Sequence, residues 1–291
     1  MTLTDHQKGL LITFFGVLLV VPDSLFVRLI SGDPMVTAFW RGATSGLFIF
    51  LGILIFKGVA GFRNILIMGW FGWFYTLLIG STAPAFVLAV TKTSVANAVF
   101  IFASMPIFSA IFSRLFLKEP IQVRTLVTML FVMLGLSFIA FGSMASEVSS
   151  WKGDIWALYV SVAYAAALTA VRKLKAFSMI PAIPLAYIGA AVVVSFFTDP
   201  IVGFSESWRL YVGHGFFIAF ATCLLTIGPR FISSPEVALL ILLESVLAPL
   251  LVWFVIGEDP GQWALIGGAV VLCSLFISNL TAFSARKNES S

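Results

Sequence analysis

The stretch Ser94–Pro120, SVANAVFIFASMPIFSAIFSRLFLKEP, decides the fold of this chain. It opens with small and polar residues and continues as an apolar run long enough to cross a membrane, with Pro106 in its middle. A basic cluster precedes its end, Glu119-Pro120. A later stretch, Pro235–Pro260, PEVALLILLESVLAPLLVWFVIGEDP, has the same plan around Pro249, but its exit is acidic and has no Lys or Arg. The likeness and the charge difference indicate two related units that enter a membrane in opposite directions.

The composition supports a membrane protein. The chain has 291 residues, of which 60% are hydrophobic and 10% charged, whereas about 25% of the residues of a soluble domain are charged. The lipid bilayer is therefore an expected partner. The net charge of +4 lies mainly in short loops and forms no basic stripe, so we expect no nucleic-acid partner. No hydrolytic, phosphate-binding or metal motif occurs, so we expect no enzyme, no catalytic or metal-binding residue and no cofactor.

Ten apolar spans of helical length follow one another along the chain. A helix of about 20 residues, rising about 1.5 Å per residue, crosses a hydrocarbon core of about 30 Å. We therefore predict an all-α membrane protein with ten transmembrane helices. The predicted spans are Gly9–Ile30, Met35–Phe56, Ile65–Val90, Ser94–Ser113, Ile121–Gly142, Gly153–Val171, Ile180–Thr198, Trp208–Gly228, Pro235–Ile256 and Gln262–Phe283.

The distribution of Lys and Arg predicts the orientation. Positively charged residues concentrate in the cytoplasmic loops of membrane proteins. With the N-terminus in the cytoplasm, the outer segments carry only Arg28, Lys92, Lys152 and Arg209. The inner segments then carry Lys8, Lys57, Arg63, Arg114, Lys118, Arg124, Arg172, Lys173, Lys175, Arg230, Arg286 and Lys287. We therefore predict that both termini are cytoplasmic.

The two halves of the chain resemble each other. Gly9–Arg28 and Gly153–Arg172 both start with Gly, run through an apolar span and close with Val-Arg. Five spans per half is an odd number, so the second half must be inverted in the membrane, as in many transporters. An old duplication in a protein that does not transport is the alternative. The predicted organisation is residues 1–142 as the first repeat, 143–152 as a linker, 153–283 as the second repeat and 284–291 as a cytoplasmic tail.

These features resemble a known family. The ten spans in two halves, the Phe39-Trp40-Arg41-Gly42 element and the acidic residue and proline after the fourth and ninth spans resemble the EamA branch of the drug/metabolite transporter superfamily. Within it the chain is most similar to YddG-type exporters of aromatic amino acids in the bacterial cytoplasmic (inner) membrane. The resemblance implies a cavity built from helices one, three, four, six, eight and nine. Many relatives place proline directly after a glutamate in the ninth span, whereas here Ser245 follows Glu244.

Three ionisable residues lie within spans. Asp23 and Arg41 both lie roughly 10 Å deep, and an unpaired charge inside a membrane costs up to about 3 kcal/mol on insertion scales. We hypothesise that they form an ion pair with a structural or gating role; the alternative is that Arg41 reaches to the outer surface. Glu244 lies near the midplane, where it could bind a coupling proton or be hydrogen-bonded to a neighbouring helix. His214 is expected to be a hydrogen-bonded interior histidine.

Prolines and small polar residues complete the predicted site. Pro22, Pro84, Pro106 and Pro249 fall inside spans, where each should kink its helix and act as a hinge or as a static kink. A neutral cavity with aromatic walls suits a zwitterion with an apolar side chain. The predicted substrate-cavity residues are Tyr75, Asn97, Phe100, Ser104, Tyr159, Tyr164, Glu244 and Ser245.

The sequence thus predicts a secondary transporter that works by alternating access. The family resemblance adds that it exports hydrophobic or aromatic amino acids and related metabolites, with a monomer as the expected form. A carrier of another small neutral or lipophilic solute, such as a drug, a purine or a threonine-like amino acid, is the first alternative. A membrane-embedded enzyme or sensor is the second, although neither a cluster of catalytic residues nor an appended domain is visible.

Overall fold

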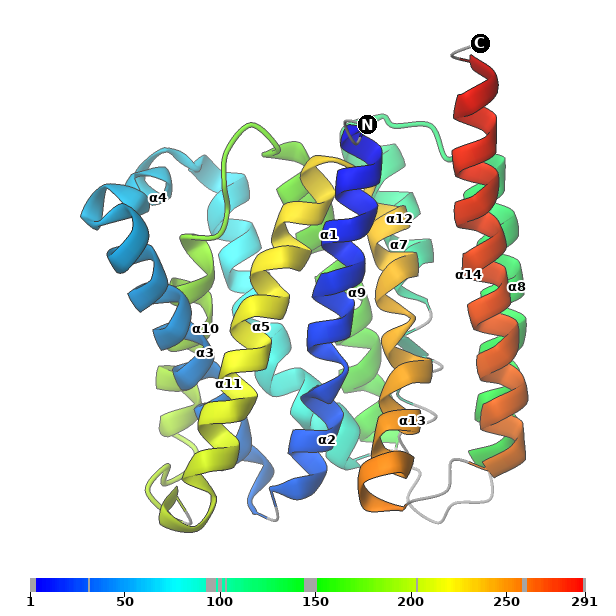
Figure 1. Cartoon of the computed structure of the whole chain (residues 1–291). Coiled ribbons are helices and arrows are strands. Elements are labelled where there is room, and N and C mark those ends of the chain that lie inside the picture. The colour runs from blue at the N-terminus through cyan, green and yellow to red at the C-terminus, as the bar shows by residue number, and fades with distance from the viewer. Residues whose placement is uncertain are drawn as a thin grey trace.

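The computed structural model describes residues 4–30, 32–92, 98, 101–102, 104–143, 151–202, 204–257 and 261–289, and every element in these ranges is helical (Figure 1). Six helices are long and apolar enough to cross a membrane: Asp5–Leu29, Pro34–Lys57, Gly69–Lys92, Trp151–Lys173, Phe204–Arg230 and Ser234–Ile256. Shorter apolar helices are Met105–Leu117, Val123–Phe138, Ala182–Ser195 and Leu265–Ile277. The fold is that of an all-helical membrane protein, as predicted, while the number of crossings stays a prediction.

The elements follow the order of the predicted spans. Their bounds are α1 Asp5–Val20, α2 Pro22–Leu29, α3 Pro34–Lys57, η1 Val59–Phe62, α4 Arg63–Ile67, α5 Gly69–Lys92, α7 Met105–Phe112, η2 Ser113–Leu117, α8 Val123–Ser143, α9 Trp151–Lys173, α10 Ala182–Ser195, α11 Phe204–Ile227, η3 Gly228–Arg230, α12 Ser234–Ile241, α13 Glu244–Ile256 and α14 Gly261–Glu289. Helices α1 and α2 together form one membrane-length helix with an interruption. Helices α12 and α13 do the same.

Both ends of the chain lie at the same end of the bundle (Figure 1). We call the end at which α1 begins and α14 ends the terminal face, and the opposite end the distal face. Helix α1 runs away from the terminal face, whereas α9 runs toward it. This reversal is what an inverted repeat requires, but the repeat boundaries stay a prediction. Lys57 and Arg172, two of the bases used to predict the orientation, lie in the last turns of α3 and α9, and both of these helices end at the terminal face.

Helices from the two halves pack closely on one another. Helix α3 lies against α10 and α11, α5 against α9 and α10, and α1 against α11. Glycines permit the close approach: a Cβ at Gly42 would lie 2.9 Å from the Tyr187 carbonyl oxygen, and one at Gly80 would lie 2.8 Å from that of Ala186. Small residues at such contacts are typical of membrane helix packing. Helices α8 and α14 form a separate pair at one edge of the bundle (Figure 1).

The helix interruptions coincide with only two of the four predicted hinge prolines. Helix α1 ends one residue before Val21, and Pro22 is the first residue of α2. Pro106 likewise lies in the first turn of α7. A proline is tolerated there because the first N–H groups of a helix have no intrahelical partner. In contrast, α5 and α13 continue through Pro84 and Pro249.

The interruption of the ninth predicted span lies before Glu244 rather than at Pro249. Helix α12 ends at Ile241, and α13 begins at Glu244. Between them the backbone tightens, because the Leu242 N–H donates to the Leu239 carbonyl at 3.2 Å and the Leu243 N–H donates to the Leu240 carbonyl at 3.0 Å. These are bonds between residues three apart, as in a 3₁₀ turn. The carboxyl group of Glu244 therefore belongs to the first residue of a helix.

Candidate functional site

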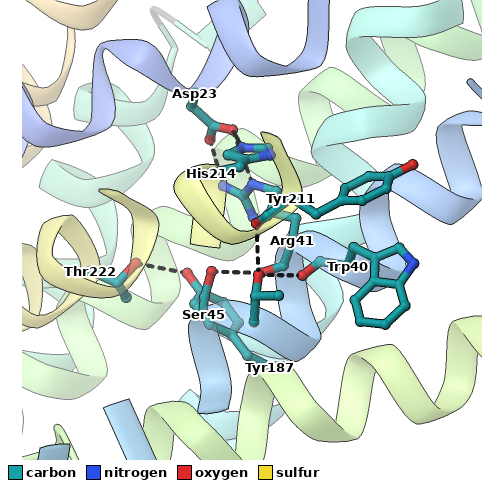
Figure 2. A network of polar contacts seen from close by, with 9 residues as sticks. Asp23, Trp40, Arg41, Ser45, Tyr187, Tyr211, His214 and Thr222 are labelled. Carbon is teal, nitrogen blue, oxygen red and sulfur yellow. Dashed lines mark hydrogen bonds and ion pairs between the residues drawn. The ribbon is translucent and has the colours of Figure 1, made fainter. Parts of the chain in front are cut away.

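Asp23, Arg41 and His214 form a buried charged cluster where three helices meet (Figure 2). Asp23 is in the first turn of α2, Arg41 in α3 and His214 in α11. The Arg41 Nε–H donates to Asp23 Oδ1 at 3.1 Å and the Nη2–H donates to Oδ2 at 2.6 Å. The residues are 1%, 7% and 0% exposed, respectively. The structure thus brings the two predicted partners together and shows Arg41 inside the bundle, not at its outer surface.

His214 completes this cluster from the second half of the chain. Its Nε2 lies 2.5 Å from Asp23 Oδ1. Because an ionised carboxylate only accepts hydrogen bonds, we assign the proton of this bond to Nε2. Its ring stacks on Phe26 of α2 with centroids 5.3 Å apart. The buried Nδ1 atom has no hydrogen-bond partner in the described part of the chain. Asp23 therefore holds α2 against both α3 and α11.

Hydroxyl groups join the same helices beside the charged cluster (Figure 2). The Tyr187 hydroxyl of α10 and the Thr222 hydroxyl of α11 are 2.8 Å apart. The Thr44 hydroxyl of α3 lies 2.6 Å from the Trp40 carbonyl of its own helix and 3.2 Å from the Tyr211 carbonyl of α11. Every one of these bonds is internal to the protein. They keep α3, α10 and α11 in register around Arg41.

Glu244 and Tyr164 differ from the groups around them because no described residue is their hydrogen-bond or ion-pair partner. Both are partly exposed, and neither makes a hydrogen bond or an ion pair among the described residues. Yet Glu244 lies within electrostatic range of Asp23, Arg41 and Tyr164. Since these groups come from α2, α3 and α9, Glu244 faces the interior of the bundle. A carboxylate and a phenol hydroxyl are thus available to a ligand there.

The structure places the other predicted cavity residues in different surroundings. Tyr75 is buried at 2% exposure, and its hydroxyl lies 2.9 Å from the Thr226 hydroxyl. Ser104 is partly exposed and 2.9 Å from the hydroxyl of Ser161. Tyr159 is 39% exposed, whereas Ser245 is buried.

The partner of the Tyr159 hydroxyl lies on another helix, α5, and the partner of the Ser245 hydroxyl lies in the preceding turn of its own chain segment. The Tyr159 hydroxyl donates to the Ser81 hydroxyl at 2.6 Å, and the Ser245 hydroxyl donates to the Leu242 carbonyl at 2.6 Å. These two hydroxyl groups already donate to protein atoms, so their protons are not free to bond to a ligand. Asn97 and Phe100 lie outside the described residues. The predicted set therefore divides into packed, bonded and available groups.

A second charged cluster lies at the terminal face and was not predicted. Glu236, in the first turn of α12, receives hydrogen bonds from the Arg124 Nη2–H at 2.9 Å and from the Ser233 N–H at 3.0 Å. His6 Nε2 of α1 lies 3.1 Å from the same carboxylate. The Ser233–Glu236 pair is a capping box that the S-x-x-E spacing could have indicated. Its partners come from the other half of the chain and have no local signal.

One further ion pair crosses between the halves near the same face. The Arg172 Nε–H of α9 donates to Glu119 Oε1 at 2.9 Å, and its Nη1–H donates to the Pro229 carbonyl at 3.2 Å. Glu119 belongs to the Glu-Pro exit of the fourth predicted span. The exit that helped to define the family resemblance thus bonds directly to the second half of the chain.

The helical fold and its buried charged clusters define a multi-pass membrane protein, and sequence comparison specifies the family. Residues 7–141 and 151–280 match the EamA-like transporter family. The chain belongs to this family, so it is a membrane transporter of small solutes and not an enzyme. A search of the curated proteins found no match to this sequence.

Solved structures are similar to this one in fold. Matches were found to 29 chains. One is the crystal structure of a protein 17% identical in sequence, and the match covers 94% of this chain and 98% of that chain with a TM-score of 0.77. At this sequence identity the likeness shows a shared fold.

Proposed function

We propose that the protein exports hydrophobic or aromatic amino acids and related metabolites across the bacterial cytoplasmic membrane by alternating access. The observation that carries this proposal is the available carboxylate of Glu244 within electrostatic range of the available hydroxyl of Tyr164 in the interior of the bundle. In this view the terminal face is cytoplasmic, as the Lys and Arg distribution predicts.

An unpartnered carboxylate favours a substrate with an ammonium group. Ionisable groups within a membrane are costly and usually either paired or functional. Asp23 and Arg41 are paired with each other, whereas Glu244 is not paired among the described residues. A substrate ammonium would supply the charge-assisted hydrogen bond that Glu244 lacks. This bond would hold the charged end of an amino acid at the Glu244 side of the site.

The surroundings of Glu244 also favour a carboxylate and an apolar side chain on the same substrate. Arg41 is within electrostatic range of Glu244, and Asp23 engages only its Nε–H and one Nη2–H. A guanidinium has five N–H donors, so others remain for a substrate carboxylate. The rings of Tyr164 and Phe86 provide aromatic surface near these charges, since the Arg41 guanidinium carbon lies 5.6 Å from the Phe86 ring centroid. A zwitterion with a hydrophobic side chain satisfies all three features.

Counterflow in proteoliposomes tests the proposal. Vesicles loaded with unlabelled phenylalanine should take up labelled phenylalanine, and tryptophan, tyrosine and leucine should compete. Glu244→Gln should weaken competition roughly 10–150-fold, the loss expected for one charge-assisted hydrogen bond of about 1.5–3 kcal/mol. Glu206→Gln, which removes an exposed carboxylate from the first turn of α11, is the matched control and should behave as wild type.

The same experiment separates the competing substrates. Counterflow of labelled adenine, threonine or a lipophilic cation, with none of labelled phenylalanine, would replace the proposed substrate class by another small solute. Unchanged competition in Glu244→Gln would remove the ammonium-binding role of this residue. A flux that amino acids fail to elicit under any loading condition would reject the amino-acid assignment.

A further inference from the structure

We propose that His214, held by Asp23 beside Arg41, is a proton-binding site that links proton entry to the opening of the distal face. The inference rests on the proposed alternating access and adds to it a proton that controls the opening. It starts from the position of His214 at the junction of the two halves, where it is the one member of the cluster that comes from the second half.

One ring nitrogen of His214 has a hydrogen-bond partner and the other has none among the described residues. Nε2 faces Asp23 Oδ1, which also accepts the Arg41 Nε–H. Nδ1 is buried and has no partner in the described part of the chain. With the proton on Nε2, Nδ1 carries a lone pair that is free to accept a proton. An unpaired acceptor inside a protein is tolerated better than an unpaired charged donor.

Protonation of Nδ1 conflicts with the arrangement seen here, in which Nδ1 is buried and Phe26 stacks on the ring. The cluster would change from one negative and one positive charge to one negative and two positive charges, and the new N–H would be buried without an acceptor. A buried uncompensated charge is strongly unfavourable. The protonated state therefore requires a rearrangement that admits water or another acceptor to Nδ1.

The other groups near the cluster do not remove this conflict. Tyr187 of α10 and Glu244 of α13 are within electrostatic range of Arg41, but neither is hydrogen-bonded to His214. On the other described elements that touch α11, Tyr75 of α5 is hydrogen-bonded to Thr226 of α11, and the remaining titratable groups lie near element ends. They are Asp5, His6 and Lys8 of α1, Arg28 of α2, Asp33 and Lys57 at the two ends of α3, and Arg230 of η3.

The element that can move is α2. It has eight residues, follows the interruption at Val21 and is fixed to α3 and α11 by Asp23. Its Phe26 covers the His214 ring. Displacement of α2 would uncover Nδ1, so opening favours proton binding and proton binding favours opening, as linkage requires. Because the enclosed ring cannot keep the proton, Nδ1 must release it to the distal side before α2 returns, so the pH at the distal face controls how readily this face opens.

Nuclear magnetic resonance of ¹⁵N-histidine tests proton binding without a substrate. The chain has 2 histidines, so His6→Gln assigns the His214 signals in the wild-type background. We expect Nδ1 of His214 to be unprotonated at neutral pH and to become protonated as the pH falls to about 5, the acidic end of the range in which histidine titrates, because burial beside Arg41 disfavours the charged ring. A His214 ring that stays neutral throughout this range would overturn the proposal.

Cysteine labelling tests the opening that should accompany protonation. Leu25→Cys on α2, in a background with Cys223→Ala and Cys273→Ala, reports exposure of this helix to a soluble maleimide. Val59→Cys, exposed in η1, corrects for the pH dependence of the thiol reaction itself. The corrected rate should rise about 5–150-fold on acidification, the usual range of coupling between two sites. The rise should vanish in His214→Gln, and a rise that persists in this variant would refute the link.

Transport measurements separate this inference from the proposed function. Acidification of the distal side should change the rate of phenylalanine export by the wild type, and His214→Gln should lose this pH dependence while keeping counterflow. Counterflow with no effect of distal pH on the wild type would reject the pH-dependent opening but keep the substrate. Proton-linked labelling with no amino-acid counterflow would reject the substrate class but keep the proton site.

Discussion

Gly215→Ala should separate α3 from α11 next to the charged cluster. A Cβ at this position would lie 2.0 Å from Thr44 Oγ1, 2.5 Å from Thr44 Cβ and 2.9 Å from the backbone nitrogen of Ser45. Thr44 cannot simply rotate away, because its hydroxyl lies 2.6 Å from the Trp40 carbonyl and 3.2 Å from the Tyr211 carbonyl. The two helices must therefore shift, and the shift would also strain the bond between His214 and Asp23.

The size of the effect follows from three contributions. Overpacking costs about 1–3 kcal/mol, and the lost threonine hydrogen bond costs about 1 kcal/mol. Replacing glycine by alanine within a helix returns about 1 kcal/mol. The net loss should be about 1–3 kcal/mol, which corresponds to a fall in melting temperature of roughly 2–10 °C.

Thermal unfolding of the detergent-purified variants measures this loss. Gly52→Ala is the matched control, since it lies in α3 and an added Cβ would meet nothing within 4 Å. Gly52→Ala should unfold at or slightly above the wild-type temperature. If Gly215→Ala were as stable as Gly52→Ala, the close contact between α3 and α11 would not exist in the folded protein.

Three further predictions concern the charged residues. Glu244→Gln should change the melting temperature by less than about 2 °C, because Glu244 has no partner to lose among the described residues; a larger fall would show a structural role. Arg41→Gln should cost about 3–5 kcal/mol in thermal unfolding because it leaves Asp23 buried without its main partner, and adding Asp23→Asn should restore more than half of this loss; additive losses would show that the two charges are not coupled. Glu236→Gln should weaken the contact with Arg124 and raise cysteine labelling at the terminal face about 10–150-fold, since a hydrogen bond to a charged group is worth about 1.5–3 kcal/mol; an unchanged rate would mean that packing alone holds this face.

The helical class and the Asp23–Arg41 contact could be predicted because both depend on simple constraints. Long apolar runs in a chain with few charges have few solutions other than membrane helices. Two opposite charges at similar depth in consecutive spans have a strong reason to meet. His214 is separated from Asp23 by 191 residues, so its identity as the third member depended on how the halves pack.

The rotation and interruption of helices were harder to predict. Tyr75 and Tyr164 have the same side chain and both lie within spans, yet one hydroxyl is bonded and the other is available. Only the orientation of each helix decides between these outcomes. Pro249 was a clear signal for a kink, but the helix is interrupted before Glu244, where the sequence contains only leucines. The local change to 3₁₀ geometry could not be predicted from the sequence because no proline or glycine lies at this position.

The short length of α10 has a consequence for the surrounding lipid. Its 14 residues make a helix of about 21 Å at a rise of about 1.5 Å per residue, well below the roughly 30 Å of a typical hydrocarbon core. Exposed Phe196 and Phe197 follow the helix directly and extend its apolar surface. Either the bilayer thins beside α10 or part of these rings lies in the headgroup region. Each ångström of such hydrophobic mismatch costs a fraction of a kcal/mol. Acyl-chain length in the host membrane therefore acts directly on the side of the bundle where α10 packs against α3 and α5.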